Sequence, residues 1–382
     1  MVEVEKIHAW IPKNPEEFTV KPYDVIDDEE LKSLRKIPGS AIHIILPEGE
    51  DEEKYKNARL NIEHAYAELM TDDGRQAYLY EEYSTEFSQR GFILGVSLED
   101  YLSGKVKIHE KTREKPLADR IRHIESTQSH TGLVWLVFRK NEELKGLMNE
   151  IMKRNPVFEF NKYGYTHRLW RLTDDEFQRV KELMAPIELY VADGHHRIAA
   201  ASEYYRNHPD QTEAKYVMAY CASDDEVRIL PYNRVIRKLS MSMEEFMSRV
   251  SEKFYVEETN KDKPDKHEIL MYNGKWYSLK PKKIPGDPVG SLDVSILQNE
   301  ILAPILGIDN PRKDPNIFFV GGKMTKKDME EFINGKGNAL FFYLHPTSIH
   351  ELEQVADLGQ DMPPKSTWFD PKLLTGLVFH KL

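Results

Sequence analysis

Residues 186–206 of this chain read Pro-Ile-Glu-Leu-Tyr-Val-Ala-Asp-Gly-His-His-Arg-Ile-Ala-Ala-Ala-Ser-Glu-Tyr-Tyr-Arg. Residues 187–192 form a short apolar run with β-branched and aromatic members, which predicts a buried strand. Asp193-Gly194 is a turn signal, and the apolar residues between Ile198 and Tyr205 recur at helical spacing. The stretch therefore predicts a strand, a tight turn and a helix.

The turn carries an unusual set of side chains. Asp193 can cap the new helix through its carboxylate, and Gly194 lets the backbone turn or approach a ligand closely. The first helical amides and the helix dipole favour an anion, and His195, His196 and Arg197 crowd the same end. A helix cap needs none of these three. Adjacent histidines point roughly 100° apart on a helix, so one metal ion could hardly use both, and a phosphate site is the better interpretation.

The composition is that of a globular protein with a large core. The chain has 382 residues, of which 40% are hydrophobic and 31% are charged. This length suits two domains, or one domain with a sizeable appendage. The texture of the sequence changes near residue 240. We therefore expect a first region over residues 1–240, which holds the phosphate site and an N-terminal elaboration, and a C-terminal α/β region over residues 241–382 that packs on it.

Charge and cysteine content exclude several classes of function. The formal net charge is −11, which argues against a nucleic-acid partner because phosphate contacts need clustered lysine and arginine. The single cysteine, Cys221, excludes an internal disulfide framework and a cysteine-based metal cluster, and its apolar surroundings predict a core thiol. The sequence shows neither a signal peptide nor an apolar stretch long enough to cross a bilayer. We expect a cytoplasmic protein without a membrane partner.

A second polar cluster lies over residues 106–116, Val-Lys-Ile-His-Glu-Lys-Thr-Arg-Glu-Lys-Pro. Leu117, Ile121 and Ile124 follow at helical spacing, and Pro116 suits a first helical turn. The cluster is therefore expected on a loop that enters an amphipathic helix. Taken alone, it is interpreted as a solvated charged loop.

The remaining segments mix both kinds of secondary structure. Residues 41–46, 91–98 and 133–138 are expected strands, residues 51–70 an expected helix, and residues 374–379 a final strand. We found no internal repeat. Because strands and helices alternate throughout, the predicted fold class is α/β or α+β.

Seven motifs together resemble a known family. They are Pro-Tyr-Asp-Val (22–25), Gly-Phe-Ile-Leu-Gly-Val (91–96), His-Glu-Lys-Thr (109–112), Lys-Pro-Leu-Ala-Asp-Arg (115–120), His-Arg-Leu-Trp-Arg-Leu (167–172), Ala-Asp-Gly-His-His-Arg (192–197) and Met-Pro-Pro-Lys-Ser-Thr (362–367). This set resembles the uncharacterised bacterial and archaeal family DUF1015 over essentially the whole chain. The resemblance implies a ParB/sulfiredoxin-like mixed sheet core with inserted and C-terminal α/β elaborations.

The same superfamily includes the free serine kinases, which carry an early His-Glu before a helix and a later strand ending in Asp-Gly-His-His-Arg. This chain is similar in both respects, with a longer insertion between the two motifs. By this resemblance Glu110 matches the catalytic carboxylate, and residues 193–197 match the turn that handles phosphate. Sulfiredoxin-like chemistry requires a cysteine where His195 stands.

The resemblance implies a phosphotransferase with ATP or ADP and Mg²⁺ as cofactors. Glu110 would accept the proton of a small hydroxyl substrate, with serine as the first candidate, while the glycine turn holds phosphates. Asp193 or Asp119 would hold the magnesium ion, although Asp193 has the rival role of helix cap. The remaining candidates are two catalytic histidines beside Glu110 and three further anion contacts: His109, His196, Lys115, Arg120 and Lys365.

Two alternatives stay open. One is a nucleotide-binding or nucleotide-hydrolysing switch protein of ParB-like type, which uses the same pocket without an acceptor. The other is a non-catalytic ligand-binding protein that keeps only the fold. The switch protein would share Gly194 and Arg197 with the phosphotransferase, but a pure binder does not need Glu110. A homodimer is left open in all three cases.

Overall fold

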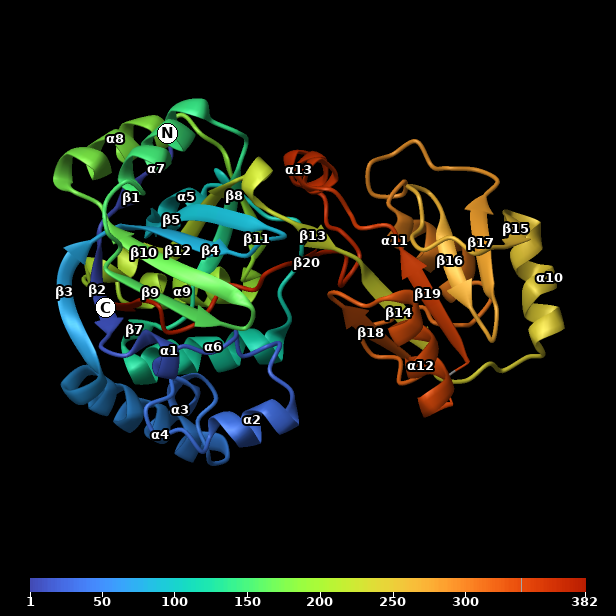
Figure 1. Cartoon of the computed structure of the whole chain (residues 1–382), viewed down its shortest axis with the longest axis horizontal. Coiled ribbons are helices and arrows are strands. Elements are labelled where there is room, and N and C mark those ends of the chain that lie inside the picture. The colour runs from blue at the N-terminus through green and yellow to red at the C-terminus, as the bar shows by residue number, and fades with distance from the viewer. Residues whose placement is uncertain (338) are drawn as a thin grey trace. The chain divides into compact units, whose positions relative to one another are not determined.

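The computed structural model describes residues 1–337 and 339–382, which form two compact units. Unit 1 comprises Met1–Val227 together with Pro371–Leu382, and unit 2 comprises Arg228–Asp370. The observed division thus lies between residues 227 and 228, whereas the sequence suggested residue 240. In Figure 1 the C-terminal strand, drawn in red, returns among the blue and green strands of unit 1. Unit 2 is therefore inserted into unit 1.

A nine-stranded mixed sheet forms the centre of unit 1. Its order is β6-β11-β8-β12-β5-β4-β10-β9, with β1 also paired to β5. These strands are β1 (Val4–Glu5), β4 (Tyr78–Tyr83), β5 (Ser88–Ser97), β6 (Val106–Lys107), β8 (Val134–Phe138), β9 (Phe158–Lys162), β10 (Tyr165–Arg171), β11 (Leu189–Asp193) and β12 (Tyr216–Ser223). The mixed α/β class predicted from the sequence is confirmed.

The helices of unit 1 are α1 (Pro15–Phe18), α2 (Asp28–Leu34), α3 (Ile42–Ile45), α4 (Asp51–His64), α5 (Leu98–Leu102), α6 (Glu114–Thr127), α7 (Glu142–Ile151), α8 (Asp174–Met184) and α9 (His195–Asn207), with short π or 3-10 turns at Ala65–Leu69, Glu213–Lys215 and Asp224–Glu226. Residues of helices α5–α9 share the apolar core of this sheet, whereas α1–α4 contribute to a second apolar cluster in unit 1. Helix α6 packs against α9 and α4. Cys221 is a buried core residue as expected, and burial raises the pKa of its thiol.

The strand expected over residues 41–46 is wrong, because Ile42–Ile45 form helix α3. Ile42, Ile44 and Ile45 are buried together with Ile62 of α4 in one apolar cluster. A short, mostly apolar run such as residues 41–46 fits a buried strand and a buried helical turn equally well, and contacts with α4 decide between them.

A smaller sheet gathers segments from distant parts of unit 1. Its order is β3-β2-β21-β7, with β2 (Ile7–Pro12), β3 (Met70–Gln76), β7 (Ser129–His130) and β21 (Phe379–Lys381). The final strand thus begins only at the last of the predicted residues 374–379, and before it Thr375 makes an isolated bridge with Val20. Strand β21 pairs with both β2 and β7, so it ties the last residues into unit 1.

Unit 2 is built on a six-stranded antiparallel sheet of order β15-β17-β16-β19-β14-β18 and a two-stranded pair, β13-β20. Its elements are β13 (Ile229–Leu230), β14 (Tyr232–Ile236), α10 (Met243–Lys253), β15 (Phe254–Glu258), β16 (Ile269–Tyr272), β17 (Trp276–Pro281), α11 (Asp293–Leu297), a π turn (Gln298–Leu302), β18 (Ile317–Gly321), α12 (Lys326–Lys336), β19 (Leu340–Leu344), α13 (Ile349–Asp357) and β20 (Trp368–Phe369). In the part of the chain that the structure describes, every helix is too short or too polar to cross a membrane.

Candidate functional site

The strand, turn and helix predicted for residues 187–206 are confirmed as β11, Gly194 and α9. Strand β11 pairs with β8 through a register shift between Val191 and Asp193, an irregularity that redirects the last side chain of the strand. Gly194 has φ +98°, a left-handed conformation that L residues rarely adopt. A Cβ on Gly194 would also lie 3.0 Å from Nε of Arg197. The glycine is needed for its backbone conformation and for the room it leaves to Arg197.

Sheet topology brings the second polar cluster to the same place. Strands β6 and β11 are parallel neighbours, with Val106 opposite Leu189 and Lys107 opposite Tyr190. Parallel neighbours end at the same edge of a sheet. Residues 108–113, which follow β6, and residues 194–196, which follow β11, therefore emerge side by side.

Two contacts fix the loop of residues 108–113 onto the N-terminus of α9. The rings of His109 and His195 meet edge to face, with their centroids 4.5 Å apart. The backbone N–H of Arg113 donates a hydrogen bond to Nε2 of His196 at 3.0 Å. Glu110 lies on the loop between these two contacts, half-buried. The structure thus brings together the two motifs that the sequence singled out separately.

The histidines at this end of α9 have different roles. Burial lowers the pKa of His195 to about 4, so its imidazole is neutral at neutral pH. Within the residues that the structure describes, the buried Nε2 of His195 has no hydrogen-bond partner. Nε2 of His196 accepts a hydrogen bond, so the proton of its neutral form lies on Nδ1. His196 therefore holds the loop through Nε2.

Asp193 does not cap α9. Its Oδ1 accepts a hydrogen bond from the N–H of Gly194 at 3.0 Å, and Gly194 is the residue at the cap position. Nζ of Lys372 lies 3.3 Å from Oδ2 of Asp193, and Nη2 of Arg197 lies 3.5 Å from the same oxygen. Burial alone would raise the pKa of Asp193, but Lys372 and Arg197 hold it well below its usual range. Gly194, the N-cap residue of α9, has no side chain with which to cap the helix. A helix N-terminus of this kind favours an anion.

Arg197 joins the turn to the neighbouring strand. Its side chain is 14% exposed and donates a hydrogen bond from Nη1 to the carbonyl oxygen of Leu133, just before β8. The same guanidinium pairs with Asp193, and Arg197 also lines a small cavity beside α6. Arg197 is therefore held at a fixed position between the Asp-Gly turn and that cavity.

The other predicted residues are spread more widely. Asp119, on α6, accepts hydrogen bonds from Nζ of Lys54 at 2.7 Å and from Nε of Arg120 at 3.0 Å. Lys115 is exposed on the first turn of α6. Lys365 belongs to unit 2, where its Nζ lies 5.4 Å from the ring centre of Tyr232.

The two predicted magnesium ligands do not fit a metal ion held by the protein. Asp193 is already neutralised by Lys372 and Arg197, and Asp119 by Lys54 and Arg120. A hard cation needs carboxylate oxygens whose charge is not balanced in this way. We therefore derive no step through magnesium.

Sequence reasoning missed several residues at the site. Lys372 is 179 residues away from Asp193 in the chain, and no local pattern marks it as a partner. Tyr23 was noticed only as part of a family motif, yet it lines the cavity beside Arg197. His130 follows α6 without a motif of its own and lines the same cavity.

Fold and site together define a mixed α/β protein. The N-terminus of its helix α9 favours an anion and lies beside the loop that carries the carboxylate of Glu110. The family model described as "Protein of unknown function (DUF1015)" matches residues 7–295. The chain belongs to this family, as its seven motifs suggested. No curated protein matches the chain.

Solved structures are similar only distantly. A variant of a free serine kinase in complex with AMP has 14% sequence identity and a TM-score of 0.39, covering 72% of this chain and 87% of that one. A conserved hypothetical protein from Pyrococcus furiosus has 15% identity and a TM-score of 0.38, covering 74% and 92%. SbnI from Staphylococcus aureus, truncated at its C-terminus, has 12% identity and a TM-score of 0.41, covering 74% and 85%. Scores this low support no argument about activity.

Proposed function

We propose that unit 1 is a nucleotide-dependent phosphotransferase that acts on a small hydroxyl compound. One observation carries this proposal: the loop with Glu110 is fixed, through His109 and Arg113, beside the N-terminus of α9, whose N-cap residue is a glycine. Phosphoryl transfer requires mainly positioning and charge stabilisation, and a helix N-terminus beside a carboxylate supplies both.

In this mechanism the phosphates of ATP or ADP lie against the first amides of α9. Glu110 accepts the proton of the acceptor hydroxyl, whose oxygen attacks the terminal phosphorus. The bond from that phosphorus to the bridging oxygen breaks, and the nucleotide leaves with one phosphate fewer. His195 is neutral and buried, so it packs the loop without adding charge. Serine is the first candidate for the acceptor, because the motifs around Glu110 and Asp193 resemble those of free serine kinases.

The alternative is a protein that binds nucleotide or another ligand without transferring a phosphoryl group. One observation favours it: Asp193 and Asp119 are both paired with two cations, which leaves neither as a ligand for the metal that nucleotide chemistry usually involves. The two functions differ over Glu110, which a binder does not use.

The test is Glu110→Gln, which keeps the shape of the side chain and removes its basic carboxylate. The matched control is Glu114→Gln, an exposed carboxylate on the first turn of α6, four residues later. Nucleotide affinity is measured by calorimetry, and turnover by formation of phosphorylated product from hydroxyl compounds. We expect Glu110→Gln to lower turnover by roughly 10²- to 10⁴-fold with nucleotide affinity unchanged, and Glu114→Gln to change neither. Full turnover in Glu110→Gln would refute its role as base, and a parent that binds nucleotide but phosphorylates nothing would favour the binder.

A further inference from the structure

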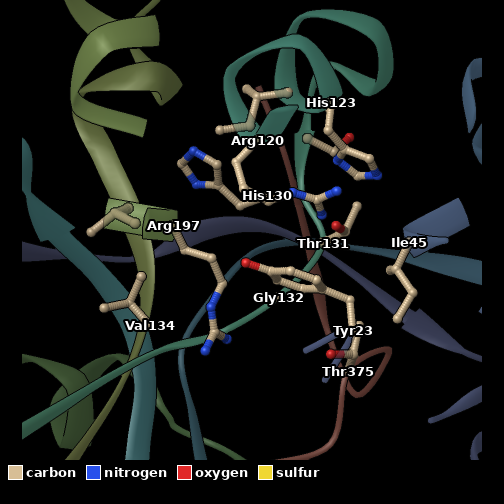
Figure 2. Close-up of a pocket in the computed structure, with 13 residues that line it drawn as sticks. Tyr23, Ile45, Arg120, His123, His130, Thr131, Gly132, Val134, Arg197 and Thr375 are labelled. Atoms are coloured by element: carbon tan, nitrogen blue, oxygen red, sulfur yellow. The ribbon is translucent and has the colours of Figure 1, made fainter. Parts of the chain in front are cut away.

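A small cavity lies in unit 1, between α6, the segment of residues 129–134 and Arg197. Its volume is about 40 Å³, and Figure 2 shows Tyr23, Arg120, His130 and Arg197 among the side chains that line it. Space of this size holds a few water molecules or one small polyatomic ion, and it excludes a nucleotide. The complete lining is Tyr23, Ile45, Arg120, His123, Ile124, Ser129, His130, Thr131, Gly132, Val134, Arg197, Val217 and Thr375.

The two charged side chains in this lining are both arginines. Arg120 is 11% exposed, and its guanidinium carbon lies 4.3 Å from the ring centre of Tyr23. Arg197 is 14% exposed and enters the cavity from the first turn of α9. Burial of two guanidinium groups around one space is costly unless negative charge compensates them.

Each carboxylate behind the arginines is shared with a lysine. Arg120 shares Asp119 with Lys54, and Arg197 shares Asp193 with Lys372. The pKa values of both carboxyl groups lie below their usual range, despite partial burial, because of these cations, so both are ionised at neutral pH. The other acidic group near Tyr23, Asp24, is exposed to solvent.

His130 adds a donor of hydrogen bonds. Its side chain is buried, and its Nδ1 accepts a hydrogen bond from the N–H of Met218 at 3.3 Å. Burial holds the pKa of His130 well below its ordinary value, so the ring is neutral and its proton lies on Nε2. Within the described residues this Nε2 has no hydrogen-bond partner. A buried, unpaired N–H beside two guanidinium groups requires an acceptor.

We propose that this cavity is a binding site for a small oxyanion, a carboxylate or a phosphoryl group, held between Arg120 and Arg197 with a hydrogen bond from His130. Planar carboxylates and tetrahedral phosphates both match the paired donors of arginine. The site shares Arg197 with the Asp-Gly turn but has a separate lining, and it requires no nucleotide. It therefore stands whether or not unit 1 transfers phosphoryl groups.

The experiment titrates the full chain with inorganic phosphate, followed by ³¹P NMR, and with acetate, followed by calorimetry. The variants are Arg120→Met and His130→Phe, and the matched control is Arg122→Met. Arg122 lies on the same helix, is 40% exposed and pairs with Glu52 outside the cavity. Phosphate titrations are repeated with saturating ADP, which occupies the N-terminus of α9 if the proposed function is right.

We expect saturable binding of at least one anion, weakened at least tenfold by Arg120→Met and by His130→Phe and not by Arg122→Met. Binding of phosphate alone identifies a phosphoryl ligand, and binding of acetate alone a carboxylate. If His130→Phe does not fold, the test depends on Arg120→Met alone. We expect Arg120→Met to fold, because Asp119 keeps Lys54 and the hydroxyl of Tyr55 as partners. Absence of saturable binding for both anions, or an equal loss in Arg120→Met and Arg122→Met, would overturn the proposal. If ADP does not bind, only the proposed phosphotransferase is contradicted, because the anion titration can still be carried out with the N-terminus of α9 unoccupied.

Discussion

Replacement of Gly194 by alanine tests whether the Asp-Gly turn is shaped by its own backbone or also by Arg197. Alanine at φ +98° is strained, which costs about 1–2 kcal/mol. Its Cβ would lie 3.0 Å from Nε and 3.2 Å from Cζ of Arg197. The guanidinium cannot move away freely, since Leu133 and Asp193 hold it. Weakening of its charge-assisted hydrogen bond costs about 1.5–3 kcal/mol more. The total expected loss is about 2.5–5 kcal/mol.

The control is Gly164→Ala, in the hairpin between β9 and β10. Gly164 has φ +81°, and a Cβ there would meet nothing within 4 Å, so this variant shows the backbone cost alone. Because a chain of two units need not unfold in one step, the free energies are taken from hydrogen exchange of amides in β11 and β10. We expect Gly194→Ala to lose at least about 1.5 kcal/mol more than Gly164→Ala. Equal losses would show that Arg197 does not constrain the turn.

Two further predictions concern charge and pH. Arg197→Ala should weaken nucleotide binding, most at low ionic strength, where a phosphate contact is least screened. The control Arg206→Ala, at an exposed position on the same helix, should leave nucleotide affinity unchanged. If Arg197→Ala binds nucleotide as tightly as the parent at all salt concentrations, Arg197 is not part of the site. Burial lowers the pKa of His123 to about 3 and that of His195 to about 4, so below pH 6.5 the unfolded chain binds protons that the folded chain does not. Stability should therefore decrease as the pH falls from 6.5 to about 4, with proton uptake on unfolding at pH 5.5, and unfolding without uptake would contradict these assignments.

The local parts of the site could be predicted from the sequence. Apolar periodicity and the Asp-Gly pair were sufficient for β11, the turn and α9, because each depends on neighbouring residues. The meeting of His109 with His195 could not be derived from spacing, since it depends on the parallel pairing of β6 and β11. Strand β6 has only two residues, too few for a pattern.

Other contacts between residues far apart in the chain could not be predicted from the sequence either. The sequence offered Asp193 as a cap or a metal ligand, and only the fold brings Lys372 to its side. Residues 41–46 were assigned to a strand, but they form a helix. A short apolar run does not distinguish a strand from a helix unless the elements packed against it are known. The cavity at Arg120 was unpredictable for the same reason, as its lining comes from seven separate segments of the chain.

The return of residues 371–382 to unit 1 has a consequence for biosynthesis. During translation, unit 1 lacks β21 and Lys372 until all of unit 2 has left the ribosome. Its four-stranded sheet then has an open edge on β2 and another on β7, the kind of exposed strand that pairs with other chains. Residues 228–370, in contrast, are synthesised without interruption. Unit 2 is thus expected to complete its folding first, and the nascent unit 1 is the part of the protein that most needs protection by a chaperone.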